Sequence, residues 1–182
     1  VWIAKRLLLT APVPQCLEWF AASDTVLEPQ IYQRLCAIEY QPSFATMVRL
    51  KGPSVTPKPG GVWLSGEPLT WIADNTQKGI GSEREGAPAV GRLTLHSGPN
   101  FARKHWDDDP EEVGRMMIAA GKPWMGSEVE TFVTHRWKYS LAIRHDPAPF
   151  LKIASPHPIW FAGDGFCAPR VEGAAMSGWI VA

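Results

Sequence analysis

The sequence has no excess of charge of either sign. Its 18 lysine and arginine residues equal its 18 aspartate and glutamate residues, so the formal net charge at pH 7 is zero. A chain without a net positive field does not attract polyanions from a distance. It also lacks an apolar run of the roughly 20 residues that cross a bilayer. We therefore expect neither a nucleic-acid partner nor a membrane partner.

Cysteine is scarce as well. The sequence contains Cys16, Cys36 and Cys167, an odd number with no pair at C-x-x-C spacing. This argues against a disulfide framework and against a zinc site, so we expect reduced thiols and no bound metal. Because no signal peptide is evident, we also expect a cytoplasmic protein.

Apolar side chains, proline and glycine are abundant. Apolar residues make up 45% of the chain and charged residues 20%, a balance that excludes disorder and permits a buried core. The 17 prolines and 16 glycines predict many turns. Residues 6–11 already have the pattern of a buried strand, close to the first residue. We therefore expect that an amino-terminal part of the protein is absent from this sequence.

Hydrophobic periodicity predicts a mixed order of strands and helices. Asp109 and Pro110 are expected to start the clearest helix as N-cap and first residue. The order indicates an α+β fold with a mostly antiparallel sheet and helices on one side. Helices are predicted at 14–22, 29–37, 107–121 and 170–182, and strands at 6–11, 44–50, 62–65, 69–74, 90–97, 128–141 and 160–162.

The last segment carries the clearest chemistry. A short strand ends in Gly163 and Asp164, and a helix begins near Val171. Asp164 can accept hydrogen bonds from hydroxyls, Gly173 permits a close backbone approach, and the helix start offers free N–H groups. This geometry suits a ligand with both polyol and anionic parts. The alternative is an ordinary strand-to-helix turn in which Asp164 is a local cap.

This segment resembles the closing motif of FAD-dependent oxidoreductases of the flavin-containing amine oxidase superfamily. The renalase-like branch is most similar, with a motif close to G-D-W-C-x-G-x-R-V-E-G-A-x-x-S-G. Residues 7–15, 93–97 and 135–140 resemble further strands of that branch, whereas Gly165 departs from the motif. The matching positions are Gly163, Asp164, Cys167, Arg170, Val171, Glu172, Gly173, Ala174, Ser177 and Gly178.

The resemblance implies FAD as the cofactor and a set of residues that bind it. These are Gly163, Asp164, Arg170, Val171, Glu172, Gly173 and Ala174. Asp164 would bond the ribityl or pyrophosphate part, and N–H groups around Gly173 would face the pyrimidine edge of the flavin. The implied reaction moves a hydride from a C–H next to nitrogen to the flavin, with reoxidation by dioxygen. The implied substrates are dihydronicotinamide-type compounds or amines, and no catalytic residue is assigned.

The sequence lacks the G-x-G-x-x-G fingerprint of dinucleotide binding. Since that motif precedes the matching stretch in the family, the resemblance implies that this chain is the carboxyl-terminal half. Residues 1–24 would be the exit strand and helix of the FAD domain, 25–150 the substrate-binding domain, and 151–182 the terminal FAD-binding strand and helix. The competing hypothesis is a non-catalytic α+β ligand- or protein-binding module that retains a vestigial flavin motif.

Four aromatic or imidazole side chains are candidates for the substrate pocket: His96, His135, Trp137 and Tyr139. Trp63 and Trp71 could add to an aromatic cage, although plain core packing explains at least half of these rings. We interpret His135 as a hydrogen-bonded histidine of the core or of a pocket wall. Arg136, on the opposite face of its strand, could bind a substrate phosphate or pair with an acid, and we favour the acid.

Overall fold

A computed structural model describes the chain except for residues 1–3, 24, 81–89 and 155–156. The chain forms two compact units. One comprises Val1–Gln41 and Tyr139–Ala182, and the other comprises Pro42–Lys138. None of the described helices is long and apolar enough to cross a membrane.

The second unit is built on a five-stranded sheet with the order β3-β4-β5-β2-β6. The pairings of β3 with β4, β4 with β5, and β5 with β2 are antiparallel. In β5 the side chains alternate, with Leu93, Leu95 and Ser97 buried. The strands are β2 (Glu39–Leu50), β3 (Gly61–Trp63), β4 (Leu69–Asp74), β5 (Arg92–Ser97) and β6 (Val129–Arg144).

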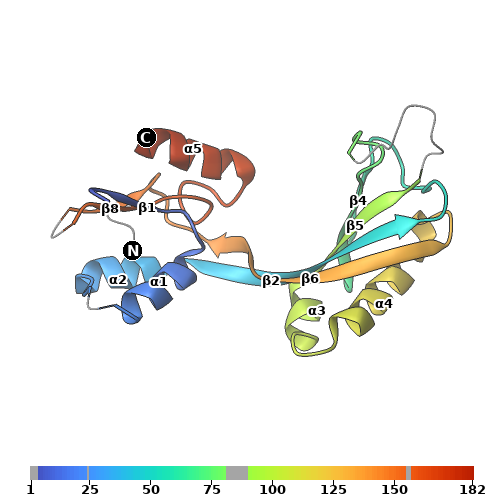
Figure 1. Ribbon diagram of the computed structural model, residues 1–182, viewed down its shortest axis with the longest axis horizontal. Helices are drawn as coiled ribbons and strands as arrows, with labels where there is room; N and C mark the ends of the chain where they lie inside the picture. Colours follow the sequence, from blue (N-terminus) through green and yellow to red (C-terminus); the bar gives the residue numbers. More distant parts are fainter. Residues whose placement is uncertain (1–3, 24, 81–89, 155–156) are drawn as a thin grey trace. The chain divides into compact units, whose positions relative to one another are not determined.

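Helices cover one face of this sheet (Figure 1). The core between the layers contains Phe44, Val48, Leu95, Val113 and Met117, all of them buried. The predicted α+β fold, with a mostly antiparallel sheet and helices on one side, is therefore confirmed. The helices are α3 (Pro99–Lys104), α4 (Pro110–Gly121) and the single-turn η1 (Lys122–Trp124).

The start of α4 follows its sequence signal. The carboxylate of Asp109 accepts hydrogen bonds from the N–H groups of Glu111 at 2.8 Å and Glu112 at 3.2 Å. These bonds satisfy two of the N–H groups that have no acceptor within the helix. The predicted N-cap and the proline after it are therefore confirmed, and the helix begins at 110 rather than 107.

The first unit contains a three-stranded sheet with the order β1-β8-β7. The β1–β8 pair is parallel, with Leu7 opposite Ile159, and the β7–β8 pair is antiparallel. Two helices pack on one side of it, and a third lies on the opposite side (Figure 1). The elements are β1 (Leu7–Leu9), α1 (Val13–Ala21), α2 (Pro29–Cys36), β7 (Leu151–Ile153), β8 (Ile159–Phe161) and α5 (Val171–Val181).

Three of the described elements were not predicted, and the long strands extend further than expected. The helix α3, the single-turn η1 and the strand β7 are six, three and three residues long, too short to display a period. The strand β2 begins five residues before the predicted 44, because Pro42 within it masks the pattern. Residues 25–41 and 139–150 fold with the two ends of the chain, outside the Pro42–Lys138 unit. The assignment of those ends to an FAD-binding domain stays a prediction.

Candidate functional site

A buried serine joins α5 to the loop that follows β8. Gly163 has a φ of 118°, a conformation that favours glycine. Its N–H donates to the Oγ of Ser177 at 2.9 Å, and this hydroxyl donates to the carbonyl oxygen of Pro149 at 2.5 Å. The helix therefore has a fixed attachment to the strand end. Ser177 belongs to the matched motif, but the sequence alone did not indicate this positioning role.

Asp164 is partly exposed beside Tyr40. The Tyr40 hydroxyl donates to Oδ1 of Asp164 at 3.4 Å, a long hydrogen bond. Burial first, and then the negative charge of Asp164, raise the pKa of Tyr40, so the hydroxyl stays protonated as a donor. A carboxylate has about four acceptor positions, so Asp164 retains capacity for the hydroxyls of a ligand.

The start of α5 is open on one side and tightly packed on the other. Val171 is 85% exposed, and Arg170 occupies the N-cap position without a side-chain cap. Gly173 is buried, and a Cβ atom there would lie 2.0 Å from the carbonyl oxygen of Ala168. Glycine is therefore required for this approach to Ala168. The expectation that Gly173 permits the close approach of a ligand stays a prediction. Glu172 is exposed and Ala174 partly buried.

An ion pair that the sequence did not reveal stabilises the loop between β8 and α5. The guanidinium of Arg34 on α2 contacts the buried carboxylate of Asp146 through both Nε and Nη2, the latter 2.9 Å from Oδ1. The backbone of Asp146 donates to Gly165 O and accepts from the N–H of Cys167, each at 2.9 Å. Burial raises the pKa of Asp146, but the bonds from Arg34 and from the N–H of Ala148 outweigh it, so the pKa is lowered.

The predicted pocket residues of the second unit lie on the face of the five-stranded sheet that α3 and α4 leave uncovered, here named the open face. Trp63 lies opposite Trp71, Trp71 opposite His96, and His96 opposite Ala45, so these four residues form one row across the sheet. The centres of the Trp63 and Trp71 rings are 4.5 Å apart. Burial, and then the positive charge of Lys78, lower the pKa of His96, so it is neutral at pH 7.

His135 and Trp137 are exposed on β6, and the centres of their rings are 4.6 Å apart. The interpretation of His135 as a core histidine is therefore wrong, because alternation along a strand does not reveal which face is covered. A place in a pocket wall stays a prediction. Arg136 donates to the carbonyl oxygen of Asp108, not to a carboxylate, which corrects the expected acid partner.

Tyr139 is separate from these candidates, because it belongs to the first unit. Its ring lies edge-on to Tyr40, with 5.7 Å between the ring centres. Through Tyr40 it is linked to Asp164 rather than to the row of His96. Among the described residues, no group of three histidine, cysteine, aspartate or glutamate side chains could hold a metal ion.

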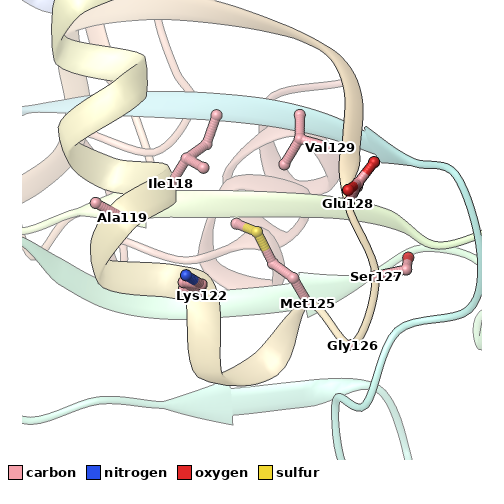
Figure 2. Close-up of a pocket in the computed structure, with 8 residues that line it drawn as sticks. All are labelled: Ile118, Ala119, Lys122, Met125, Gly126, Ser127, Glu128 and Val129. Carbon is pink, nitrogen blue, oxygen red and sulfur yellow. The ribbon is translucent and has the colours of Figure 1, made fainter.

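Two hollows in the second unit differ in chemistry. One, of about 490 Å³, lies where α4 and η1 lead into β6, and Figure 2 shows aliphatic Ile118, Met125 and Val129 around it. Its polar rim includes Glu128, whose carboxylate pairs with Lys51 at 2.7 Å. The other, of about 430 Å³, crosses β5, β2 and β6 on the open face. None of the predicted substrate-pocket residues His96, His135, Trp137 and Tyr139 is among the residues that line this second hollow.

No protein-family model matches the chain, and no curated protein matches it. Solved structures do match. A protein from Exiguobacterium sp. 255-15, described as a candidate protoporphyrinogen oxidase, has a TM-score of 0.63 and 16% identity over 98% of this chain and 40% of its own. An oxidoreductase from Methanosarcina mazei has a TM-score of 0.66 and 13% identity over 99% of this chain and 43% of its own.

A cyclohexylamine oxidase from Brevibacterium oxydans IH-35A has a TM-score of 0.57 and 12% identity over 96% of this chain and 43% of its own. The chain thus spans about 40% of the length of the first structure and 43% of the other two. At these identities the likeness concerns the fold. From end to end, the chain has the fold of a part of these oxidoreductases.

Proposed function

We propose that this chain is the carboxyl-terminal part of a renalase-like, FAD-dependent oxidoreductase. Its last strand and helix would contact the flavin, and the open face would bound the substrate site. The observation that carries the proposal is the conformation of residues 163–177. Gly163, Gly173 and Ser177 of the closing motif each meet a geometric requirement there. The length of the structural neighbours beyond the matched part supports the same proposal.

The residues at this site fit a flavin nucleotide. The exposed start of α5 offers N–H groups without an intrahelical acceptor, which suit an electron-rich edge. The buried Gly173 allows the start of the helix to pack closely against Ala168 of the preceding loop. Asp164 has acceptor capacity for ribityl hydroxyls, and Arg170 adds positive charge beside the helix start. Arg34 and Asp146 hold the loop that positions these groups.

The flavin would accept a hydride from a C–H next to nitrogen and pass the electrons to dioxygen. The protein would bind and orient the substrate, exclude water, and present the α5 dipole where negative charge develops. The substrate would be a small molecule, of dihydronicotinamide or amine type. His96, neutral because of its lowered pKa, can donate or accept one hydrogen bond without adding charge to the pocket.

The test is flavin retention by the protein expressed from its complete gene. We expect a purified protein with the absorption bands of bound flavin, and at least tenfold weaker retention in the Asp164→Ala variant, because a hydrogen bond to a charged group is lost. Asp107→Ala removes an exposed carboxylate in the other unit and should leave retention unchanged. A colourless wild type would favour the non-catalytic binding module, and full retention by Asp164→Ala would refute the role of Asp164.

A further inference from the structure

Gly165 is the residue at which the segment after β8 departs from the flavin motif, and space rather than backbone conformation explains the glycine. Its φ is not positive, so the backbone there does not require glycine. Gly165 is buried, and a Cβ atom there would lie 2.7 Å from the hydroxyl oxygen of Tyr40 and 3.2 Å from Cγ2 of Ile38. Any larger side chain at this position would therefore displace the Tyr40 hydroxyl.

The space at Gly165 lets the Tyr40 hydroxyl reach the residue before it. Tyr40 is the second residue of β2, but it belongs to the first unit, together with residues 139–182. Its hydroxyl donates to Oδ1 of Asp164 at 3.4 Å. A side chain from the start of β2 thus contacts the carboxylate in the loop after β8, 124 positions further along the chain.

The phenol group of Tyr40 is itself held in place. Its ring packs edge-on against Tyr139, and it contacts the buried core of the first unit. Burial first, and then the charge of Asp164, raise the pKa of this phenol, and a backbone hydrogen bond from Val13 lowers it by less. Val13 is the first residue of α1, so its N–H has no acceptor within the helix. Since the oxygen of Tyr40 accepts from this N–H, its proton remains for Asp164.

We propose that Tyr40 is a positioning residue of the flavin site, whose hydroxyl holds the Asp164 carboxylate through Oδ1 so that its other acceptor positions can bind a hydroxyl of the flavin. Gly165 leaves the space that this contact needs. A carboxylate that is already held loses less conformational freedom when a ligand binds, which strengthens binding. The identity of the ligand as a flavin rests on the proposed function.

A double-mutant cycle on flavin affinity tests whether Tyr40 acts through Asp164. The protein expressed from its complete gene would be stripped of flavin and titrated with FAD. Tyr40→Phe should raise the dissociation constant about three- to tenfold, because a hydrogen bond to a carboxylate is lost. In the Asp164→Ala background, the same change should have less than about a twofold effect. A role of Tyr40 in packing alone would give equal effects in the two backgrounds.

Gly165→Ala tests the need for space. The added methyl group should displace the Tyr40 hydroxyl and weaken FAD binding about three- to tenfold. Combined with Tyr40→Phe, it should cost less than it does alone, because the hydroxyl that it would meet is absent. The matched control is Tyr32→Phe, which removes the hydroxyl of a tyrosine that is 51% exposed on α2 and should leave FAD binding unchanged. Circular dichroism would confirm that each variant is folded.

A measurement without flavin tests the contact itself. In protein isotopically labelled at Cζ of tyrosine, the NMR resonance that Tyr40→Phe removes belongs to Tyr40. The chemical shift of this carbon responds to the hydrogen bond that the hydroxyl makes. We expect the Tyr40 resonance of the flavin-free protein to shift in Asp164→Ala and to stay in place in Asp107→Ala, which changes an exposed residue of the other unit.

Two results would overturn the inference: equal effects of Tyr40→Phe in the two backgrounds, or a Tyr40 resonance that does not respond to Asp164→Ala. A wild type that binds FAD no more tightly than its folded Tyr40→Phe variant contradicts this inference alone. A wild type that binds no FAD contradicts the proposed function and the flavin assignment with it, even where the Tyr40 resonance still reports the contact with Asp164.

Discussion

Arg34 and Asp146 are 112 positions apart, yet their ion pair holds the loop of the candidate flavin site. The Asp146 carboxylate is buried, so it needs the guanidinium and the N–H of Ala148 to compensate for lost hydration. No local pattern connects the two residues in the sequence. The matched motif predicted Gly163, Asp164 and Gly173, but a partner from another helix becomes visible only when the chain is folded.

Replacement of Arg34 tests the importance of this ion pair. Arg34→Gln should lower the free energy of unfolding by about 1.5–3 kcal/mol near pH 7, because a buried carboxylate loses charge-assisted hydrogen bonds. Chemical denaturation would measure the change. The control is Arg115→Gln, which removes an exposed pair on α4 and should cost about 0.2–1 kcal/mol at most.

The effect should depend on pH in a defined direction. The pKa of Asp146 is lowered from its ordinary value of 3.8 in the folded protein. Its contribution is therefore fully present above that value and is lost as the pH falls through the lower, folded pKa. The difference in stability between wild type and Arg34→Gln should shrink below about pH 4. A difference that persists into strong acid would contradict this account.

At the scale of elements, the sequence predicted most helices and strands but not their partners. The helix α4 was predictable because Asp109 and Pro110 are strong local start signals. The register that brings Arg49 opposite Arg92 depends on two strands separated by a long connection, and periodicity does not determine such a pairing. For the same reason the exposure of His135 was not predictable. The alternation in β6 is visible, but which face the helices cover is not.

The helix α5 is apolar but attached through small residues. Only Gly173 and Ser177 are buried in it, whereas Trp179 is 84% exposed. Its attachment therefore depends on the close contact of Gly173 with Ala168 and on the hydrogen bonds of Ser177, rather than on large apolar side chains.

Two glycine substitutions in this helix should have opposite effects. Gly173→Ala places a Cβ 2.0 Å from a carbonyl oxygen, and should lower the free energy of unfolding by about 1–3 kcal/mol. Gly178→Ala meets nothing within 4 Å, and should raise it by about 0.5–1 kcal/mol through helix propensity. Amide hydrogen exchange in α5 would report both changes. Similar exchange rates in the two variants would contradict the proposed attachment.

At the scale of the whole molecule, two compact units bear different parts of the proposed activity. The first unit holds the closing motif, and the second holds the open face with its aromatic row. The solved structures that share this fold extend well beyond the matched part. Composition indicated a folded chain with no net charge, and the motif resemblance supplied the expectation of a flavin.

The most direct measurement of the central claim is a crystal structure of the protein expressed from its complete gene and grown with FAD. We expect the isoalloxazine ring within hydrogen-bond distance of the backbone N–H groups of residues 171–173, with Asp164 bonded to the ribityl or pyrophosphate part. A structure in which residues 163–178 contact only protein, with FAD absent or bound elsewhere, would contradict the account.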